Sequence, residues 1–338
     1  MKTKSLHFGK AMSAALFVLL LVVVGTKNAL AQTLMATLQH NDSITGVFYG
    51  QNALVSAHDA ADNGDVITLS SGTFISNGIS KCVTIHGAGC VYDTLTNVSP
   101  TIISNLEIHA DNVTFEGIRF GNIAISYGSS YVDFVKCNIN NIYGVHNMVN
   151  KMSFQFNNCI INNFSSNKYH GTTIINSIVR FTAYYHEDIY NPNNIYNSVI
   201  VFDNQLPINN LVAYNSIIAV VSDNNVSNCA FYNCIGIETG ETLLFEGQTV
   251  QNVMEVNSYE DVFETFDGTI IYDNIYQLKN EIATSFLGHD GTEVGIYGGL
   301  KPYRTRPHFM IIRNCNVAGR TTIDNKLSVE IELLDVDE

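Results

Sequence analysis

The sequence predicts an all-β solenoid, in which short strands wind into stacked coils of about 20 residues. A five-residue phrase recurs along the middle of the chain: an apolar residue, a variable residue, Asn, Ser or Cys, and a second apolar residue. Its copies lie at 156–160, 174–178, 195–199, 213–217 and 231–235, with degenerate copies at 114–118 and 134–137. Successive small residues of the phrase are 20, 22, 18, 21, 18 and 18 residues apart. A repeat of this length is typical of solenoids.

The runs between these phrases give the second observation. Strands of three to five residues, separated by Asn, Gly and Ser, continue to about Ile237 without a helical pattern of 10–15 residues between them. This excludes a doubly wound α/β sheet and favours coils that stack by parallel pairing, about 4.8 Å apart. The expected fold is therefore a single-stranded, right-handed parallel β-helix with a short N-terminal capping helix and C-terminal strands.

Two columns of residues are expected to run along the coils. Asn tolerates left-handed turns, and its amide both donates and accepts, so Asn side chains on neighbouring coils can form a hydrogen-bonded ladder. The Ser and Cys that follow are expected to be buried small residues, because Ser replaces Cys and cannot serve in a disulfide. The expected columns are Asn158, Asn176, Asn197, Asn215 and Asn233, and Cys137, Cys159, Ser177, Ser198, Ser216 and Cys234.

The elements are expected in this order. Residues 1–31 have a basic start, an apolar run and an Ala-x-Ala site, as in a secretory signal peptide. Residues 32–65 are a lead-in with a capping helix at 51–61, and residues 66–300 are the β-helix with a closing segment. Residues 301–338 add a short extension with strands at 309–312 and 327–334. The protein is therefore expected to be exported, to the periplasm, outer surface or medium, with no membrane span after cleavage.

Charge and cysteine content limit the partners. The formal net charge is −14, and cleavage would remove four of the 17 basic residues and none of the 31 acids, leaving −18. This argues against nucleic acid and anionic membranes, which require basic patches. Seven Cys is an odd number, so at least one is free or pairs between chains. Cys82 and Cys90 could bridge, although their spacing does not establish it.

The chain resembles right-handed parallel β-helix proteins of the pectin-lyase-like superfamily, from about residue 51 to 299. An Ala-rich helix followed by Asn63-Gly64-Asp65-Val66-Ile67-Thr68-Leu69 and Gly72-Thr73-Phe74 looks like that family's cap and first coil. The tail at 276–278 and 290–299 is similar to the close of exported β-helix proteins of Bacteroides-type bacteria. The superfamily includes polysaccharide lyases, hydrolases and adhesins. The polygalacturonase signatures and a calcium ligand set of the pectate-lyase kind are absent, so no cofactor is expected and calcium has no motif to support it.

Three functions remain open from the sequence. The first is a non-catalytic protein that binds glycan or another cell-surface partner through loops rich in Tyr, because Tyr rings stack on sugars. Its candidate residues are Tyr169, His170, Tyr184, Tyr185 and Tyr190.

The second function is a polysaccharide lyase or glycoside hydrolase. Its candidate catalytic residues are Arg180 for charge stabilisation, His186 for proton transfer, and Glu187 and Asp188 as acid or base. The third is a structural or assembly role in which the C-terminal strands pair with another chain. The oligomeric state stays open.

Overall fold

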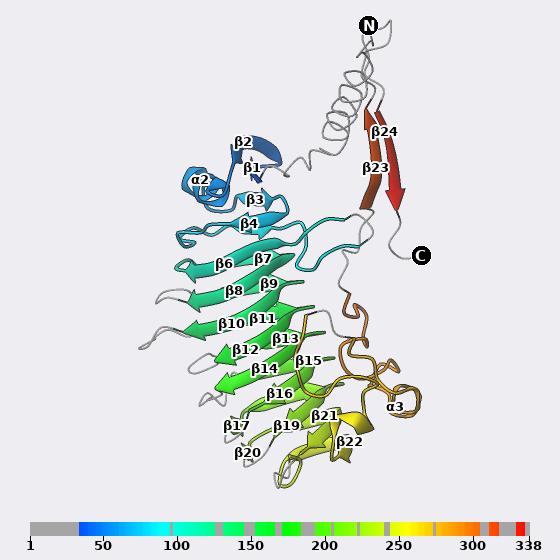
Figure 1. Ribbon diagram of the computed structural model, residues 1–338. Coiled ribbons are helices and arrows are strands. Elements are labelled where there is room, and N and C mark those ends of the chain that lie inside the picture. Colours follow the sequence, from blue (N-terminus) through cyan, green and yellow to red (C-terminus); the bar gives the residue numbers. More distant parts are fainter. Residues whose placement is uncertain are drawn as a thin grey trace, which may run out of the picture. The chain divides into compact units, whose positions relative to one another are not determined.

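The computed structural model describes residues 34–94, 97–125, 131–144, 153–165, 171–183, 193–203, 206–221, 224–239, 244–272, 275–304, 311–317 and 329–334. Most of these residues form a parallel β-solenoid of about eight turns, with coils of about 19 residues. Figure 1 shows the strands stacked one above another along the solenoid. The predicted fold class is confirmed.

Each coil contributes to two long parallel sheets, which we call sheet 1 and sheet 2. The strands of sheet 1 are β3 (Val66–Leu69), β5 (Thr84–His86), β7 (Val113–Glu116), β9 (Tyr131–Val135), β11 (Ser153–Asn157), β13 (Thr173–Ile175), β15 (Asn193–Tyr196) and β18 (Leu211–Tyr214). Those of sheet 2 are β4 (Gly72–Phe74), β6 (Thr101–Ile108), β8 (Ile118–Ile125), β10 (Asn138–Gly144), β12 (Ile160–Ser165), β14 (Ile178–Ala183), β16 (Val199–Phe202) and β19 (Ile217–Val220). The long strands β21 (Ala230–Glu238) and β22 (Thr249–Val256) pass through both sheets. A third, small sheet pairs β17 (Pro207–Asn209) with β20 (Asn225–Ser227).

The corner between sheet 1 and sheet 2 explains the Asn column. At this corner each of the five predicted Asn residues has a φ between 44° and 56°, in the left-handed region that Asn tolerates better than most residues. Gly117 (φ 67°), Lys136 (φ 49°) and Asn252 (φ 53°) extend the column on either side. The repeated Asn therefore turns the chain from one sheet into the next.

The small residue that follows is buried and satisfies backbone groups at the same corner. The Ser198 hydroxyl donates to the Tyr196 carbonyl at 2.7 Å and accepts from the Ser177 amide of the preceding coil at 3.1 Å. The amide of Ser198 in turn donates to the Ser216 hydroxyl at 3.1 Å. Cys137, Cys159 and Cys234 occupy equivalent places and are fully buried. The expectation of buried small residues is confirmed.

Side-chain ladders of Asn occur, but chiefly in another column. Within sheet 2, Asn163 donates to Asn141 at 2.8 Å, Asn141 donates to Asn122 at 2.7 Å, and Asn122 donates to Asn105 at 3.0 Å. In the predicted column the Asn252 amide donates to Asn233 at 2.7 Å. Other members of that column bind the closing segment, as described below.

The core inside the coils is aliphatic and aromatic. Phe115, Phe134 and Phe156 stack on successive coils with ring centroids 5.4 Å apart, and Phe181 stacks on Phe202 at 5.0 Å. All five rings are buried. Such stacks add roughly 0.5–1.5 kcal/mol per pair beyond the burial of their area.

The N-terminal lead-in contains two strands besides the expected capping helix. Strands β1 (Met35–His40) and β2 (Ser43–Tyr49) form an antiparallel hairpin, and β1 pairs antiparallel with β3. Helix α2 (Ala53–Ala60) is the predicted capping helix, and it buries Ala53, Leu54 and Ala57. The hairpin therefore extends sheet 1 by two strands beyond its first coil.

The segment after the last coil, residues 259–304, is the closing segment. It contains the short helices η1 (Tyr259–Asp261) and α3 (Asn280–Ser285). Its side chains Val262, Phe263, Phe266 and Tyr276 are buried in a second hydrophobic cluster against the outer side chains of sheet 2. The segment therefore returns along the solenoid and covers one outer face.

The final extension is a separate antiparallel pair. Strands β23 (Ile311–Val317) and β24 (Val329–Leu334) pair with each other in a two-stranded sheet. β24 lies within the predicted strand at 327–334, whereas β23 overlaps the predicted strand at 309–312 only at residues 311–312 and continues to Val317.

Candidate functional site

Most of the residues predicted for binding or catalysis lie outside the described residues. The chain between β12 and β13 contains Tyr169 and His170, and the chain between β14 and β15 contains Tyr184, Tyr185, His186, Glu187, Asp188 and Tyr190. Both segments lead directly into strands of sheet 1. Their proposed roles remain predictions.

Arg180 is described, and it contacts the closing segment. It lies on the outer side of β14, and its guanidinium Nη2 donates to the Gly268 carbonyl. Burial raises the pKa of nearby Tyr259 to about 12, against the opposing effect of the Arg180 charge. Arg180 therefore helps to hold the closing segment on sheet 2.

The outer face of sheet 2 is buried along its later coils. Ile178, Val199, Ile217 and Ile235 form one outer row, and each is at most 1% exposed beneath the closing segment. At the corner, the Asn176 amide donates to the carbonyls of Ile296 and Gly298 at 3.0 and 2.8 Å. The Asn215 and Asn158 side-chain oxygens accept from the amides of His289 and Arg304 at 2.9 and 3.3 Å. These bonds fix the closing segment along the edge of sheet 1.

The outer face of sheet 1 is half-exposed and carries a row of aromatic rings. Tyr196, Tyr214 and Tyr232 occupy the same position on β15, β18 and β21, and none is fully buried. Their ring centroids are 5.4 and 4.7 Å apart, and the ring planes are within 13° of parallel. Burial, followed by the two neighbouring phenols, raises the pKa of Tyr214. We call these three residues the tyrosine row.

A row of polar side chains lies on the same outer face, on earlier coils, and meets the tyrosine row only at β15, where Asn194 comes two residues before Tyr196. It contains Thr114, Asp133, Gln155, Thr173 and Asn194, which occupy one register position on five successive strands and are all partly exposed. Coils at a parallel spacing of about 4.8 Å present these groups at a regular interval. We call this set the polar row.

Titratable groups gather at the N-terminal part of the same face. His86 Nδ1 is 3.0 Å from Glu116 Oε2, and this hydrogen bond lowers the pKa of Glu116. Desolvation raises the pKa of Asp133, whose Oδ1 is buried without a hydrogen-bond partner. The Tyr131 hydroxyl donates to Gln155 Oε1 at 3.2 Å. The two carboxyls therefore differ in their tendency to hold a proton.

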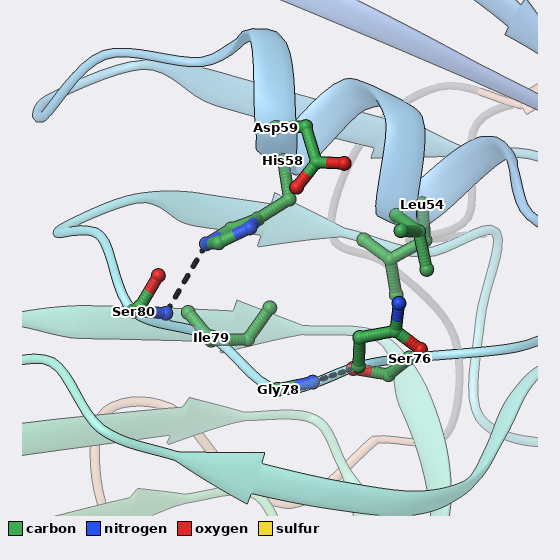
Figure 2. Close-up of a pocket in the computed structure, with 9 residues that line it drawn as sticks. Leu54, His58, Asp59, Ser76, Gly78, Ile79 and Ser80 are labelled. Atoms are coloured by element: carbon green, nitrogen blue, oxygen red, sulfur yellow. Dashed lines mark hydrogen bonds between the residues drawn. The ribbon is translucent and has the colours of Figure 1, made fainter.

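A small pocket lies between α2 and residues 76–80 (Figure 2). It has a volume of about 110 Å³. His58 Nε2 accepts from the Ser80 amide at 3.2 Å, and burial lowers the pKa of His58, which favours the neutral ring. The Lys81 ammonium donates to the carbonyls of His58, Asp59 and Ala61, the last residues of the helix and its C-cap. These bonds hold the C-terminal end of the helix against the chain at Ser80 and Lys81.

The cysteines within the described part of the solenoid are unpaired. Cys82, Cys90, Cys137, Cys159, Cys229 and Cys234 are free thiols, so the possible bridge between Cys82 and Cys90 is not formed. Burial raises the pKa of Cys90 and Cys234 to about 12, which keeps them protonated and unreactive. Among the residues that the structure describes, no group of His, Cys, Asp and Glu is arranged to hold a metal ion.

The tyrosine row was missed as a site, although its signal is in the sequence. Tyr196, Tyr214 and Tyr232 each precede the Asn in three successive copies of the repeat. Interpreting the phrase only as a structural repeat hid the fact that its variable position faces outward. A repeated aromatic residue at an outward position was the available clue.

No protein-family model, curated protein or solved structure matches this chain. Within the described ranges, no helix is both long and apolar enough to span a membrane. The fold supports the parallel β-helix part of the expected resemblance. Membership of the pectin-lyase-like superfamily remains an expectation from the sequence.

Proposed function

We propose that this protein is an exported, non-catalytic β-helix that binds glycan on the outer face of sheet 1. The observation that carries the proposal is the tyrosine row, three half-exposed phenols on successive coils. Each phenol combines an apolar ring with a hydroxyl that donates and accepts, a combination suited to sugars. Export rests on the signal-like residues 1–31.

The contrast between the two outer faces supports this choice of surface. The later coils of sheet 2 are covered by the closing segment, whereas the corresponding coils of sheet 1 keep their outward side chains partly exposed. Asn194 on β15, two residues before Tyr196, and Thr173 and Gln155 on the two preceding coils supply amide and hydroxyl groups on the same face. Sugar hydroxyls need both donors and acceptors, and these side chains offer both.

Charge favours an uncharged glycan over a polyuronate. The face carries Glu116 and Asp133, and the whole chain has a net charge of −14. A polyanion would be repelled unless a local cation compensated for it. Neutral plant or host polysaccharides are therefore the proposed ligand class.

The proposal is tested by affinity electrophoresis of residues 32–338 in gels that contain neutral or acidic polysaccharides. We expect retardation by at least one neutral polysaccharide. Tyr214→Ala should weaken binding about tenfold, since stacking and hydroxyl contacts together contribute on the order of 1–2 kcal/mol. The matched control is Tyr143→Ala, because Tyr143 is 47% exposed on β10 in sheet 2. Equal binding by both variants would place the site elsewhere.

A second function, glycoside hydrolysis, is favoured by the two carboxyls with opposite shifts. Glu116 lies on β7, and Asp133 pairs in register with Thr114, two residues before Glu116. A carboxyl that keeps its proton can act as general acid, and one that stays ionised can act as base or nucleophile. Asp133 would be the acid and Glu116 the base, with His86 holding Glu116 ionised.

Chain length of the polysaccharide after incubation separates the two functions. Hydrolysis predicts shortened products that disappear in Asp133→Asn and Glu116→Gln. A polysaccharide that is bound and recovered at its original length excludes hydrolysis for that ligand and leaves the binding function.

A further inference from the structure

The first strand of the extended sheet 1 has an unusual edge. Within the described residues β2 pairs with β1 alone, so its other side is a sheet edge. Its sequence, SITGVFY, contains no charge and no Pro. Ile44 and Tyr49 are each 67% exposed and Val47 is 43% exposed. Proteins usually protect such edges with Lys, Pro or a covering element, since an open edge pairs with other chains.

The C-terminal hairpin lacks a third strand to pair with. Strands β23 and β24 form a two-stranded sheet that pairs with no other strand of the described chain. A two-stranded hairpin is marginally stable in water and gains stability from a third strand. β23 and β2 are both seven residues long, and β24 has six. The lengths therefore match for strand addition.

Chain length prevents the hairpin from reaching β2 of its own molecule. Arg304 is fixed at the coil of β11 by the bond from its amide to Asn158. A strand added to β2 would lie seven strand spacings from β11, or about 34 Å at ~4.8 Å each. The seven residue steps from Arg304 to Ile311 span at most about 24 Å when fully extended. The hairpin therefore falls about 10 Å short of its own β2.

We propose that the β23–β24 hairpin of one copy adds to the β2 edge of a second copy. The added strands extend sheet 1 across two molecules, and backbone hydrogen bonds along β2 join them. The exposed Val47 and Tyr49 then lie at the contact. This assembly is independent of glycan binding, because the tyrosine row lies on β15, β18 and β21, at the other end of the sheet.

The first test compares the two end strands of the solenoid by sedimentation velocity over a range of concentrations. Val47 on β2 and Val250 on β22 are 43% and 44% exposed, so they form a matched pair. We expect residues 32–338 to self-associate, Val47→Lys to weaken association at least tenfold, and Val250→Lys to leave it unchanged. A parent protein that stays monomeric at every concentration would overturn the proposal. The proposal would also be overturned if Val250→Lys lost association while Val47→Lys associated as strongly as the parent protein.

The second test identifies the hairpin as the partner. Asn314→Pro places a residue without an amide N–H in the middle of β23, which should disrupt the hairpin and leave the solenoid folded. We expect Asn314→Pro alone and Val47→Lys alone to be monomeric. Mixed together, they should form a 1:1 complex, since one keeps an open β2 edge and the other keeps an intact hairpin. A mixture that remains monomeric would mean that β2 and the hairpin do not bind each other.

Discussion

The outer faces of the two long sheets differ although the same coils build both. In sheet 2 the outward positions of the later coils are aliphatic, and residues 259–303 cover them. In sheet 1 the outward positions mix Tyr, Thr, Asn and Gln with apolar residues such as Ile175 and Val212, and they stay partly exposed. The inner faces are alike, with buried Ile, Val and Phe in both. The fold is thus specified by the inner positions, and the outer positions decide which face the closing segment covers and which face stays exposed.

The Asn residues at the corner between the two sheets have two structural roles. They turn the chain through left-handed conformations, and three of them also bind the closing segment. Those two roles explain why Asn recurs here more than Gly, which would provide the turn without the amide. Changes at the corner should therefore have larger effects than changes on either face.

The largest effect is expected for Asn176→Ala. This change removes the hydrogen bonds to Ile296 and Gly298 and places Ala at φ 44°, and together these should cost about 3 kcal/mol of unfolding free energy. Asn176→Gly should cost about 2 kcal/mol, because Gly adopts the turn freely. Urea denaturation measures both values.

Asn228→Ala is the control for that measurement. Asn228 has a φ of 52° and is exposed, away from the closing segment, so it shares the turn but not the two bonds. We expect a loss of about 1 kcal/mol from the turn alone. Equal losses at both positions would show that Asn176 does not hold the closing segment.

The next largest effect is expected when the same substitution, Val to Thr, is made on the outer face of each sheet. Val199→Thr puts a hydroxyl on the buried outer face of sheet 2, where Val199 is 1% exposed, and should cost about 2 kcal/mol. Val212→Thr puts the same group on the half-exposed face of sheet 1 and should change stability by less than about 0.5 kcal/mol. Thermal or urea unfolding of the pair gives the difference, and similar losses would mean that sheet 2 is not covered.

A smaller effect is expected in the small-residue column. Ser198→Ala leaves the Ser177 amide without its side-chain acceptor and should cost about 1.5 kcal/mol. Ser285→Ala, at an exposed hydroxyl of α3, should cost less than about 0.5 kcal/mol. Chemical denaturation measures both losses of unfolding free energy. Equal losses in the two variants would contradict a stabilising role for the buried Ser and Cys column.

The solenoid could be predicted because its determinants are local and repeated. The Asn-Ser phrase marks each corner, and alternating apolar residues mark the strands, so the register and the buried column follow from the sequence. The closing segment could not be placed in this way. Phe263, Phe266 and Tyr276 have no periodic pattern, and the sheet 2 residues of their cluster, from Ile160 to Ile237, come from many different coils.

The candidate site was less predictable for a related reason. The predicted binding and catalytic residues lie in loops where Tyr, His and acidic residues cluster, and such clusters can be recognised from the sequence alone. The polar row unites Asp133, Gln155 and Thr173 from separate coils, and only the strand register brings them together. The contact of Arg180 with Gly268 likewise depends on the fold, and the catalytic role proposed for Arg180 stays a prediction.

The smallest effect is the pH dependence of stability in two variants, Asp133→Asn on sheet 1 and Asp267→Asn in the closing segment. Desolvation raises the folded-state pKa of Asp133 above 3.8, so its ionisation opposes folding as the pH rises through the folded-state pKa. Asp133→Asn should therefore stabilise the protein at pH 7 by a few tenths of a kcal/mol, a figure reduced for solvent screening. Below pH 3.8, where Asp is neutral in both states, the gain should vanish. Asp267→Asn should behave oppositely, because the bond from the Thr269 amide lowers the pKa of Asp267 and its ionised form favours folding. Unfolding curves at several pH values decide this, and a gain for Asp133→Asn that persists in acid would rule out a desolvated carboxyl on sheet 1.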